Sequence, residues 1–140
     1  MWKKIAGLLV AVAIGLSSGW ILRGQEFGAI AEIYYWKAKA GKLEEYNHYI
    51  KRVAEPVDAE AQRTCAFVSV TTYVSRKPES TWTHMRIFIV KDREQAANLA
   101  KALDDAGVRV QPDESKRKAN QELATSLRDS AGQEEVEILR

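Results

Sequence analysis

The sequence predicts an α+β domain with the element order βαββαβ, an antiparallel sheet and an extra C-terminal helix, preceded by an N-terminal hydrophobic helix. Three observations lead to this fold class. Segments rich in β-branched and aromatic residues alternate with segments whose apolar residues recur every three or four positions. Only about five residues separate two of the strand segments, which indicates an antiparallel hairpin. An uncharged stretch of eighteen residues precedes them all.

The length and charge of the chain exclude several classes of protein. With 140 residues the chain has room for one domain with a modest core. Its net charge of +2 argues against nucleic acid as a partner, because phosphate-binding proteins carry a strong basic excess. No phosphate-binding loop, dinucleotide-binding motif or metal-ligand spacing occurs, so no cofactor or metal site is predicted.

The N-terminal segment has the pattern of an export signal. Lys3 and Lys4 precede the uncharged residues 5–22, and Arg23 follows them. A helix of that length is about 27 Å long, close to the thickness of a bilayer core. Two alternatives remain: an uncleaved signal anchor in the lipid bilayer, or a signal peptide cleaved near residues 17–19. Either one places the domain in the periplasm of a bacterial-type cell, bound to the inner membrane or released from it.

Residues 24–28 form a predicted linker, and the domain follows over residues 29–140. Residues 29–37 are a strand, and residues 42–63 are a helix that Pro56 should kink or divide. Residues 64–75 are a second strand, in which Cys65 is expected to be a small buried residue. Residues 81–90 are a third strand.

The C-terminal third begins with a second helix. Asp92 and Gln95 resemble a capping box at its start, and Gly107 is expected to end it. Residues 113–130 form the extra helix, which is charged and only weakly amphipathic. The last strand is either residues 108–111 or residues 135–140, and the sequence leaves both open.

The βαββαβ order is that of the ferredoxin-like fold, in which helices cover one face of the sheet. The other face needs a cover. In so short a chain a second copy of the chain is the economical one, so the sequence predicts a homodimer or a subunit of a membrane-protein complex.

Four sequence segments carry a family resemblance: EIYYW at 32–36, AGKLEEY at 40–46, AFVSV at 66–70 and THMRIF at 83–88. On these segments residues 29–107 resemble the dimeric α/β-barrel superfamily, which includes antibiotic-biosynthesis-monooxygenase-like and NIPSNAP-like proteins. The resemblance implies the ferredoxin-like sheet and a dimer. It implies no single activity, because this superfold hosts monooxygenases, isomerases, haem-degrading enzymes and proteins without known chemistry.

Strand periodicity sorts the candidate site residues. The aliphatic residues of the strands, such as Met85, Ile87 and Ile89, are expected under the helices. The mixed aromatic and polar residues are then expected on the open face. They would line an aromatic cleft there, formed by Glu32, Tyr34, Trp36, Tyr73, Trp82, His84 and Arg86.

The sequence supports two functions. The first is a membrane-anchored or periplasmic interaction module, in which Glu32 and Arg86 form a cross-strand ion pair and the aromatic residues fill a dimer interface. The second is a cofactor-independent monooxygenase-like or small-molecule-binding enzyme. In it His84 beside Glu32 is a candidate general base, Arg86 binds a carboxylate or phenolate, and Tyr34, Trp36, Tyr73 and Trp82 bind the ligand. The sequence favours the first.

Overall fold

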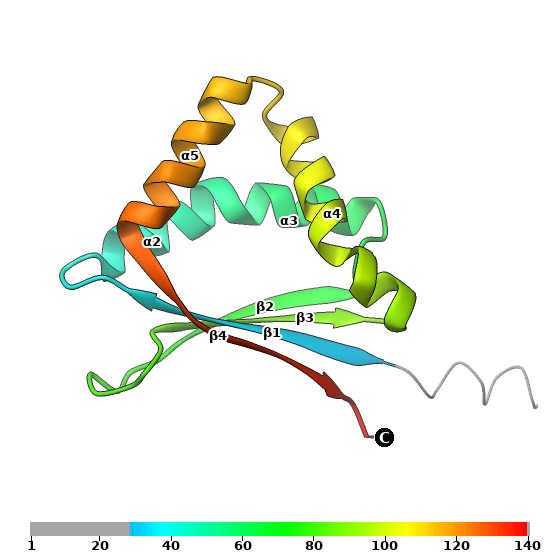
Figure 1. Ribbon diagram of the computed structural model, residues 1–140, viewed down its shortest axis with the longest axis horizontal. Coiled ribbons are helices and arrows are strands. Elements are labelled where there is room, and N and C mark those ends of the chain that lie inside the picture. Colours follow the sequence, from blue (N-terminus) through cyan, green and yellow to red (C-terminus); the bar gives the residue numbers. More distant parts are fainter. Residues whose placement is uncertain (1–28, 140) are drawn as a thin grey trace, which may run out of the picture.

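The computed structural model describes residues 29–139, which form a four-stranded antiparallel sheet with helices on one side (Figure 1). The order across the sheet is β2-β3-β1-β4. This arrangement confirms the βαββαβ fold with one inserted helix. The strands are β1 (Ile30–Ala38), β2 (Ser69–Val74), β3 (His84–Val90) and β4 (Arg128–Glu137), and the helical segments are α2 (Leu43–Tyr49), η1 (Ile50–Ala54), α3 (Glu55–Arg63), α4 (Arg93–Val110) and α5 (Glu114–Leu127).

The predicted membrane segment and linker, residues 1–28, lie outside the described residues. Within residues 29–139, no helix combines the length and the apolar character needed to cross a membrane.

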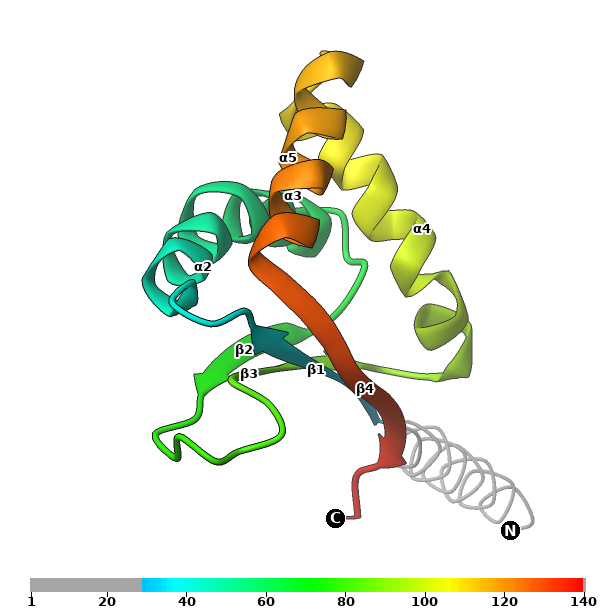
Figure 2. The same ribbon diagram turned by 60° about the vertical axis from the view of Figure 1, so that its left-hand side comes forward.

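The last strand overlaps the second of the two segments that the sequence left open, at residues 135–137, but it begins seven residues earlier than expected. Residues 108–110 belong to α4, and β4 begins at Arg128, directly after α5 (Figure 2). Its pairing with β1 shifts register between Tyr35 and Trp36, next to Gly132 with φ at +137°. Glycine adopts this backbone conformation without the steric strain that a side chain would add. The residues at the start of β4 are polar and do not show the apolar pattern of a strand. They are extended because their backbone pairs with β1.

Pro56 divides the predicted first helix, as expected. The preceding segment η1 is π-helical, and the N–H of Glu55 donates to the carbonyl of Ile50, five residues back. Proline offers no N–H for the usual bond to the residue four positions earlier, so a wider turn before it leaves fewer broken bonds. The extra residue also rotates the buried face of the helix. That face passes from Tyr46 and Ile50 to Asp58 and Ala61, rather than along the stripe through Val53 and Val57.

The expectation that Cys65 is buried in a strand was wrong. Cys65 is exposed, with φ at +60°, and it belongs to the turn that ends α3. The N–H of Ala66 donates to the carbonyl of Ala61 at 3.0 Å, as in a Schellman helix end. The left-handed residue of that motif directs its side chain outward, and β2 therefore starts only at Ser69.

The second helix begins where the capping pattern predicts it and ends later. Asp92 accepts a hydrogen bond from the N–H of Gln95 at 2.8 Å. Gly107 lies inside the helix, which continues to Val110 and stops just before Pro112. Ala106, directly before the glycine, is fully buried in the core cluster that also contains Ala61 of α3, and glycine inside a helix costs only about 1 kcal/mol.

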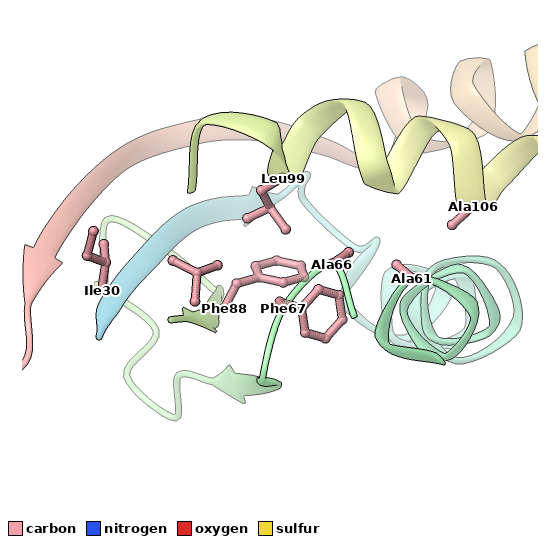
Figure 3. Close-up of a cluster of buried hydrophobic side chains, with 8 residues drawn as sticks. Ile30, Ala61, Ala66, Phe67, Phe88, Leu99 and Ala106 are labelled. Carbon is pink, nitrogen blue, oxygen red and sulfur yellow. The ribbon is translucent and has the colours of Figure 1, made fainter. Parts of the chain in front are cut away.

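The core lies between the sheet and the helices (Figure 3). Phe88 packs edge-on against Phe67 at 5.1 Å and against Tyr34 at 5.9 Å between ring centroids. Leu99 from α4 and Ala61 from α3 complete this layer. A smaller cluster joins Tyr46, Ile50 and Leu127 at the other end of the sheet.

The sequence assigned the two faces of β1 and β3 the wrong way round, whereas Tyr73 of β2 lies on the side away from the helices, as expected. Phe88, His84 and Val90 of β3 are buried under the helices, whereas Met85, Ile87 and Ile89 face the other side. Branched aliphatic residues are equally suited to a covered core and to an intermolecular interface, so their type does not distinguish the faces.

Candidate functional site

The predicted site residues lie on two different faces. Glu32, Tyr34 and Trp36 pair in register with Phe88, Arg86 and His84, all on the helix side of the sheet. Tyr73 and Trp82 lie on the opposite side, where the rings of Trp82 and Tyr35 are 6.0 Å apart. One continuous cleft of all seven residues is therefore not formed.

His84 is held by both ring nitrogens and is fully buried. Its Nε2 lies 2.8 Å from Oδ1 of Asn47, and its Nδ1 lies 2.9 Å from Oγ1 of Thr83. With the Asn47 carbonyl as acceptor, Nε2 carries the proton and Nδ1 accepts from the Thr83 hydroxyl. Burial, and then the nearby Arg128 guanidinium, lower the pKa of His84 to about 4. A substrate could reach either nitrogen only by displacing Asn47 or Thr83, and the general-base role stays a prediction.

Glu32 does not lie beside His84, as the general-base hypothesis requires. It sits four residues before the strand partner of His84, which separates the two by roughly 13 Å along β1. Its neighbours are Gln133 and Glu135 of β4. Burial raises the pKa of the Glu32 carboxyl, and the hydrogen bond with Glu135 raises it further.

Arg86 pairs with Asp58 of α3 rather than with Glu32. Its Nη2 donates to Asp58 Oδ2, and its Nε donates to the Thr72 hydroxyl at 3.2 Å. The side chains of both partners are about nine-tenths buried, at 11% and 9% exposure. Burial raises the pKa of the Asp58 carboxyl, and the Arg86 charge opposes that rise. The guanidinium of Arg86 is thus held in place between the sheet and helix α3.

Arg128 supplies a second fixed guanidinium. Its carbon Cζ lies 3.5 Å from the centre of the Trp36 ring, and its Nη1 donates to the hydroxyl of Tyr46. Burial raises the pKa values of Tyr46 and Tyr49, and the charges of Arg128 and Arg86 oppose both rises. Both guanidinium groups therefore lie within electrostatic range of the same two phenols.

These groups border a cleft of about 850 Å³ between the helices and the sheet, which we name the helix-side cleft. Its floor is formed by Arg86 and Arg128, and its walls come from η1, α3, α4 and α5. Among its wall residues are Tyr49, Arg52, Val57, Asp58, Leu103 and Lys118. The volume falls in the range of small-molecule sites.

Sequence reasoning found Trp36 and Arg86 but missed Asp58, Arg128 and Tyr49. A signal for Asp58 exists, because Ile50, Ala54, Asp58 and Ala61 follow a helical spacing of three and four residues. No sequence signal brings Arg128 to Trp36, because their contact depends on the pairing of β4 with β1. Within residues 29–139, no three His, Cys, Asp or Glu side chains gather in a metal-binding group.

The neutral state of His84 predicts a pH-dependent stability. The unfolded His84 has a pKa near 6.5, so below that pH the unfolded chain binds a proton that the folded chain takes up only near pH 4. Stability is therefore present above pH 6.5 and lost as the pH falls toward 4, by on the order of 2 kcal/mol. Urea unfolding at pH 7 and pH 4.5 should show a smaller loss in His84→Gln than in the parent protein.

The exposed His48 provides the matched control. His48→Gln should keep the pH dependence of the parent protein. An equal loss of stability in the parent and in His84→Gln would contradict the assignment.

Comparisons with known proteins place the fold. No family model and no curated protein sequence matches the chain. The solved structures that resemble it include a dimeric protein of unknown function with a ferredoxin-like fold from Bacteroides fragilis, and HapK from Hahella chejuensis. The first has 13% identity and a TM-score of 0.54, and the match covers 80% of this chain and 99% of that one. The second has 10% identity and a TM-score of 0.50, over 79% and 92%.

At these identities the likeness shows the fold alone. The narrower resemblance to antibiotic-biosynthesis-monooxygenase-like and NIPSNAP-like proteins stays a prediction. The chain therefore has a ferredoxin-like α+β fold, with the inserted helix α5 before its last strand.

Proposed function

We propose that this protein is an exported interaction module that forms a homodimer through the uncovered face of its sheet, as expected of a dimeric α/β barrel, and that residues 5–22 hold it in the membrane. The observation that carries the dimer is the composition of that face, which we name the open sheet face. It consists of Ala31, Ile33, Tyr35, Ser69, Thr71, Tyr73, Met85, Ile87, Ile89, Gly132, Glu134 and Val136.

The open sheet face has the make-up of a protein interface. Aliphatic residues, Ile33, Met85, Ile87 and Ile89, occupy its centre on the two inner strands. Aromatic residues gather at one end, where the β2–β3 loop hangs below the sheet and brings Trp82 against Tyr35 (Figure 2). Polar groups such as Glu134 lie toward the β4 edge. An apolar centre with aromatic anchors and a polar rim is typical of stable interfaces.

The distribution of charge supports a second copy of the chain as the partner on the open sheet face. A two-fold axis parallel to the strands places the β2 edge of one protomer over the β4 edge of its partner. On the side of the open sheet face, strand β4 carries the exposed acids Asp129 and Glu134, whereas the exposed bases Arg76 and Lys77 follow β2. The two edges are thus complementary in sign. One of the two similar structures is also described as dimeric.

Protein extracted from membranes in nonionic detergent tests the proposal. Light scattering after size exclusion should give the protein mass of a dimer, and the intact mass should show that residues 5–22 are retained. Ile87→Asp buries a charge in the interface and should give a monomer with an unchanged circular dichroism spectrum. Tyr73→Asp is a second variant at a position that is 48% exposed, so it disturbs the fold less.

Leu123→Asp is the matched control, because Leu123 is 44% exposed on α5, on the helix side of the sheet. It should remain dimeric. A monomeric parent protein, or dimers in both interface variants, would contradict the dimer. An intact mass that lacks the N-terminal segment would contradict the anchor and leave the cleaved signal peptide.

The alternative function is the monooxygenase-like or small-molecule-binding enzyme, and one observation favours its binding part. The predicted residues Trp36 and Arg86 lie beside a cleft, although on the helix side of the sheet and not on the open face. Catalysis by His84, Glu32 or Arg86 stays a prediction.

A further inference from the structure

The helix-side cleft exists because of the inserted helix. In a plain βαββαβ chain, the second helix leads straight to the last strand. Here α4 and α5 form two sides of an inverted V above the sheet (Figure 1). Together with η1 and α3 they border the open cleft of about 850 Å³ that Arg86 and Arg128 also line.

Positive charge dominates the cleft. Its lining contains five cationic residues against three acidic ones, an excess of two positive charges. The cationic residues are Arg52, Arg86, Arg117, Lys118 and Arg128, and the acidic ones are Asp58, Asp104 and Glu114. An anion entering this space meets a favourable potential, which low-dielectric walls strengthen.

The two floor guanidiniums are pre-organised and retain free donors. Within residues 29–139, Arg86 uses Nε and Nη2 for Thr72 and Asp58, and Arg128 uses Nη1 for Tyr46. The same residues contain no buried side-chain nitrogen without a partner, so the nitrogens that lack one, Nη1 of Arg86 and Nε and Nη2 of Arg128, each keep some exposed surface. Stacking on Trp36 fixes the plane of Arg128 before any ligand arrives.

Apolar side chains form about half of the cleft walls above this floor. Val53, Ala54 and Val57 line one side, and Leu103 and Val108 line the side of α4. Tyr49 adds a half-buried aromatic ring. An inorganic anion would leave these surfaces without a partner, whereas an apolar body would cover them.

We propose that the helix-side cleft binds a small organic carboxylate with an apolar body, with its carboxylate on Arg86 and Arg128 and its body against Val57, Leu103 and Tyr49. Guanidinium groups bind carboxylates through paired, charge-assisted hydrogen bonds. Neither the open sheet face nor dimerisation enters this site, so it is independent of the proposed dimer, and it names the ligand class for the binding part of the alternative function.

Calorimetric titration of the full chain in nonionic detergent micelles with 2-naphthoate tests the proposal, with empty micelles as the blank. We expect one binding site per chain. The neutral analogue 2-naphthamide, which has the same ring system, should bind about tenfold more weakly, because it cannot form charge-assisted bonds. This comparison needs no variant, so it holds even if a substitution unfolds the domain.

Arg128→Gln should weaken 2-naphthoate binding about tenfold or more, and Arg52→Gln at the rim should weaken it less. The matched control is Arg93→Gln, which removes an exposed arginine outside the cleft and should leave the affinity within about twofold. The proposal is overturned if the amide binds as well as the acid, if folded Arg128→Gln retains the parent affinity, or if no heat beyond the blank appears at millimolar ligand.

Discussion

Replacing Asp58 with alanine is expected to lower the free energy of unfolding by about 3 kcal/mol. The carboxylate of Asp58 is the charged partner of Arg86, and both side chains are about nine-tenths buried. Asp58→Ala leaves the guanidinium buried with only Thr72 as a side-chain partner. Urea unfolding of the full chain, followed by circular dichroism, measures the change.

Two further variants separate charge from packing at this position. Asp58→Leu combined with Arg86→Met removes both charges and should recover most of the lost stability, because no unpaired ion remains. Asp105→Ala breaks an exposed pair with Lys101 and should leave the unfolding midpoint nearly unchanged. A double variant as unstable as Asp58→Ala would show that packing, and not the unpaired charge, causes the loss.

Phe88→Ala is expected to destabilise the domain by about 3 to 4 kcal/mol. Phe88 is 3% exposed and lies at the centre of the core, with Phe67 and Tyr34 edge-on to its ring. The Arg86 guanidinium also lies 5.2 Å from the ring centre, so the variant loses a cation–π contact as well as apolar burial. The same unfolding measurement gives the size of the effect.

Leu139→Ala is the matched control, because Leu139 is 95% exposed. Its removal should change the free energy of unfolding by less than about 0.5 kcal/mol. A loss below about 1 kcal/mol for Phe88→Ala would mean that the two faces of the sheet are assigned incorrectly here, since an interface residue would lose little in the folded monomer.

Local patterns predicted most elements and few of the site contacts. The Asp92 cap and the division at Pro56 both follow from chemistry within a few residues, and both are present. Strand β4 was largely missed, since Asp129, Gln133 and Glu134 have low strand propensity and only pairing with β1 holds them extended. The end of α4 was misplaced for a similar reason, because packing of Ala106 outweighs the preference of Gly107.

The site residues show the same contrast between what local patterns predict and what long-range packing sets. Period-two alternation correctly grouped Glu32, Tyr34 and Trp36 on one face and His84 and Arg86 on the corresponding face of β3. It could not tell which face the helices cover, because alternation carries no information about the position of a helix. The pairing of Arg86 with Asp58 and the stacking of Arg128 on Trp36 join residues 28 and 92 positions apart in the chain.

Local patterns in the chain were enough to predict the βαββαβ order, the inserted helix and which side chains of one strand share a face. Contacts between distant segments set which face is covered, where the last strand begins and which charges meet beneath the helices. The two kinds of information differ in the distance along the chain over which they act. Propensity, capping and periodicity act over a few residues, whereas the cover of a sheet and the partners of Arg86 and Arg128 depend on packing between distant segments.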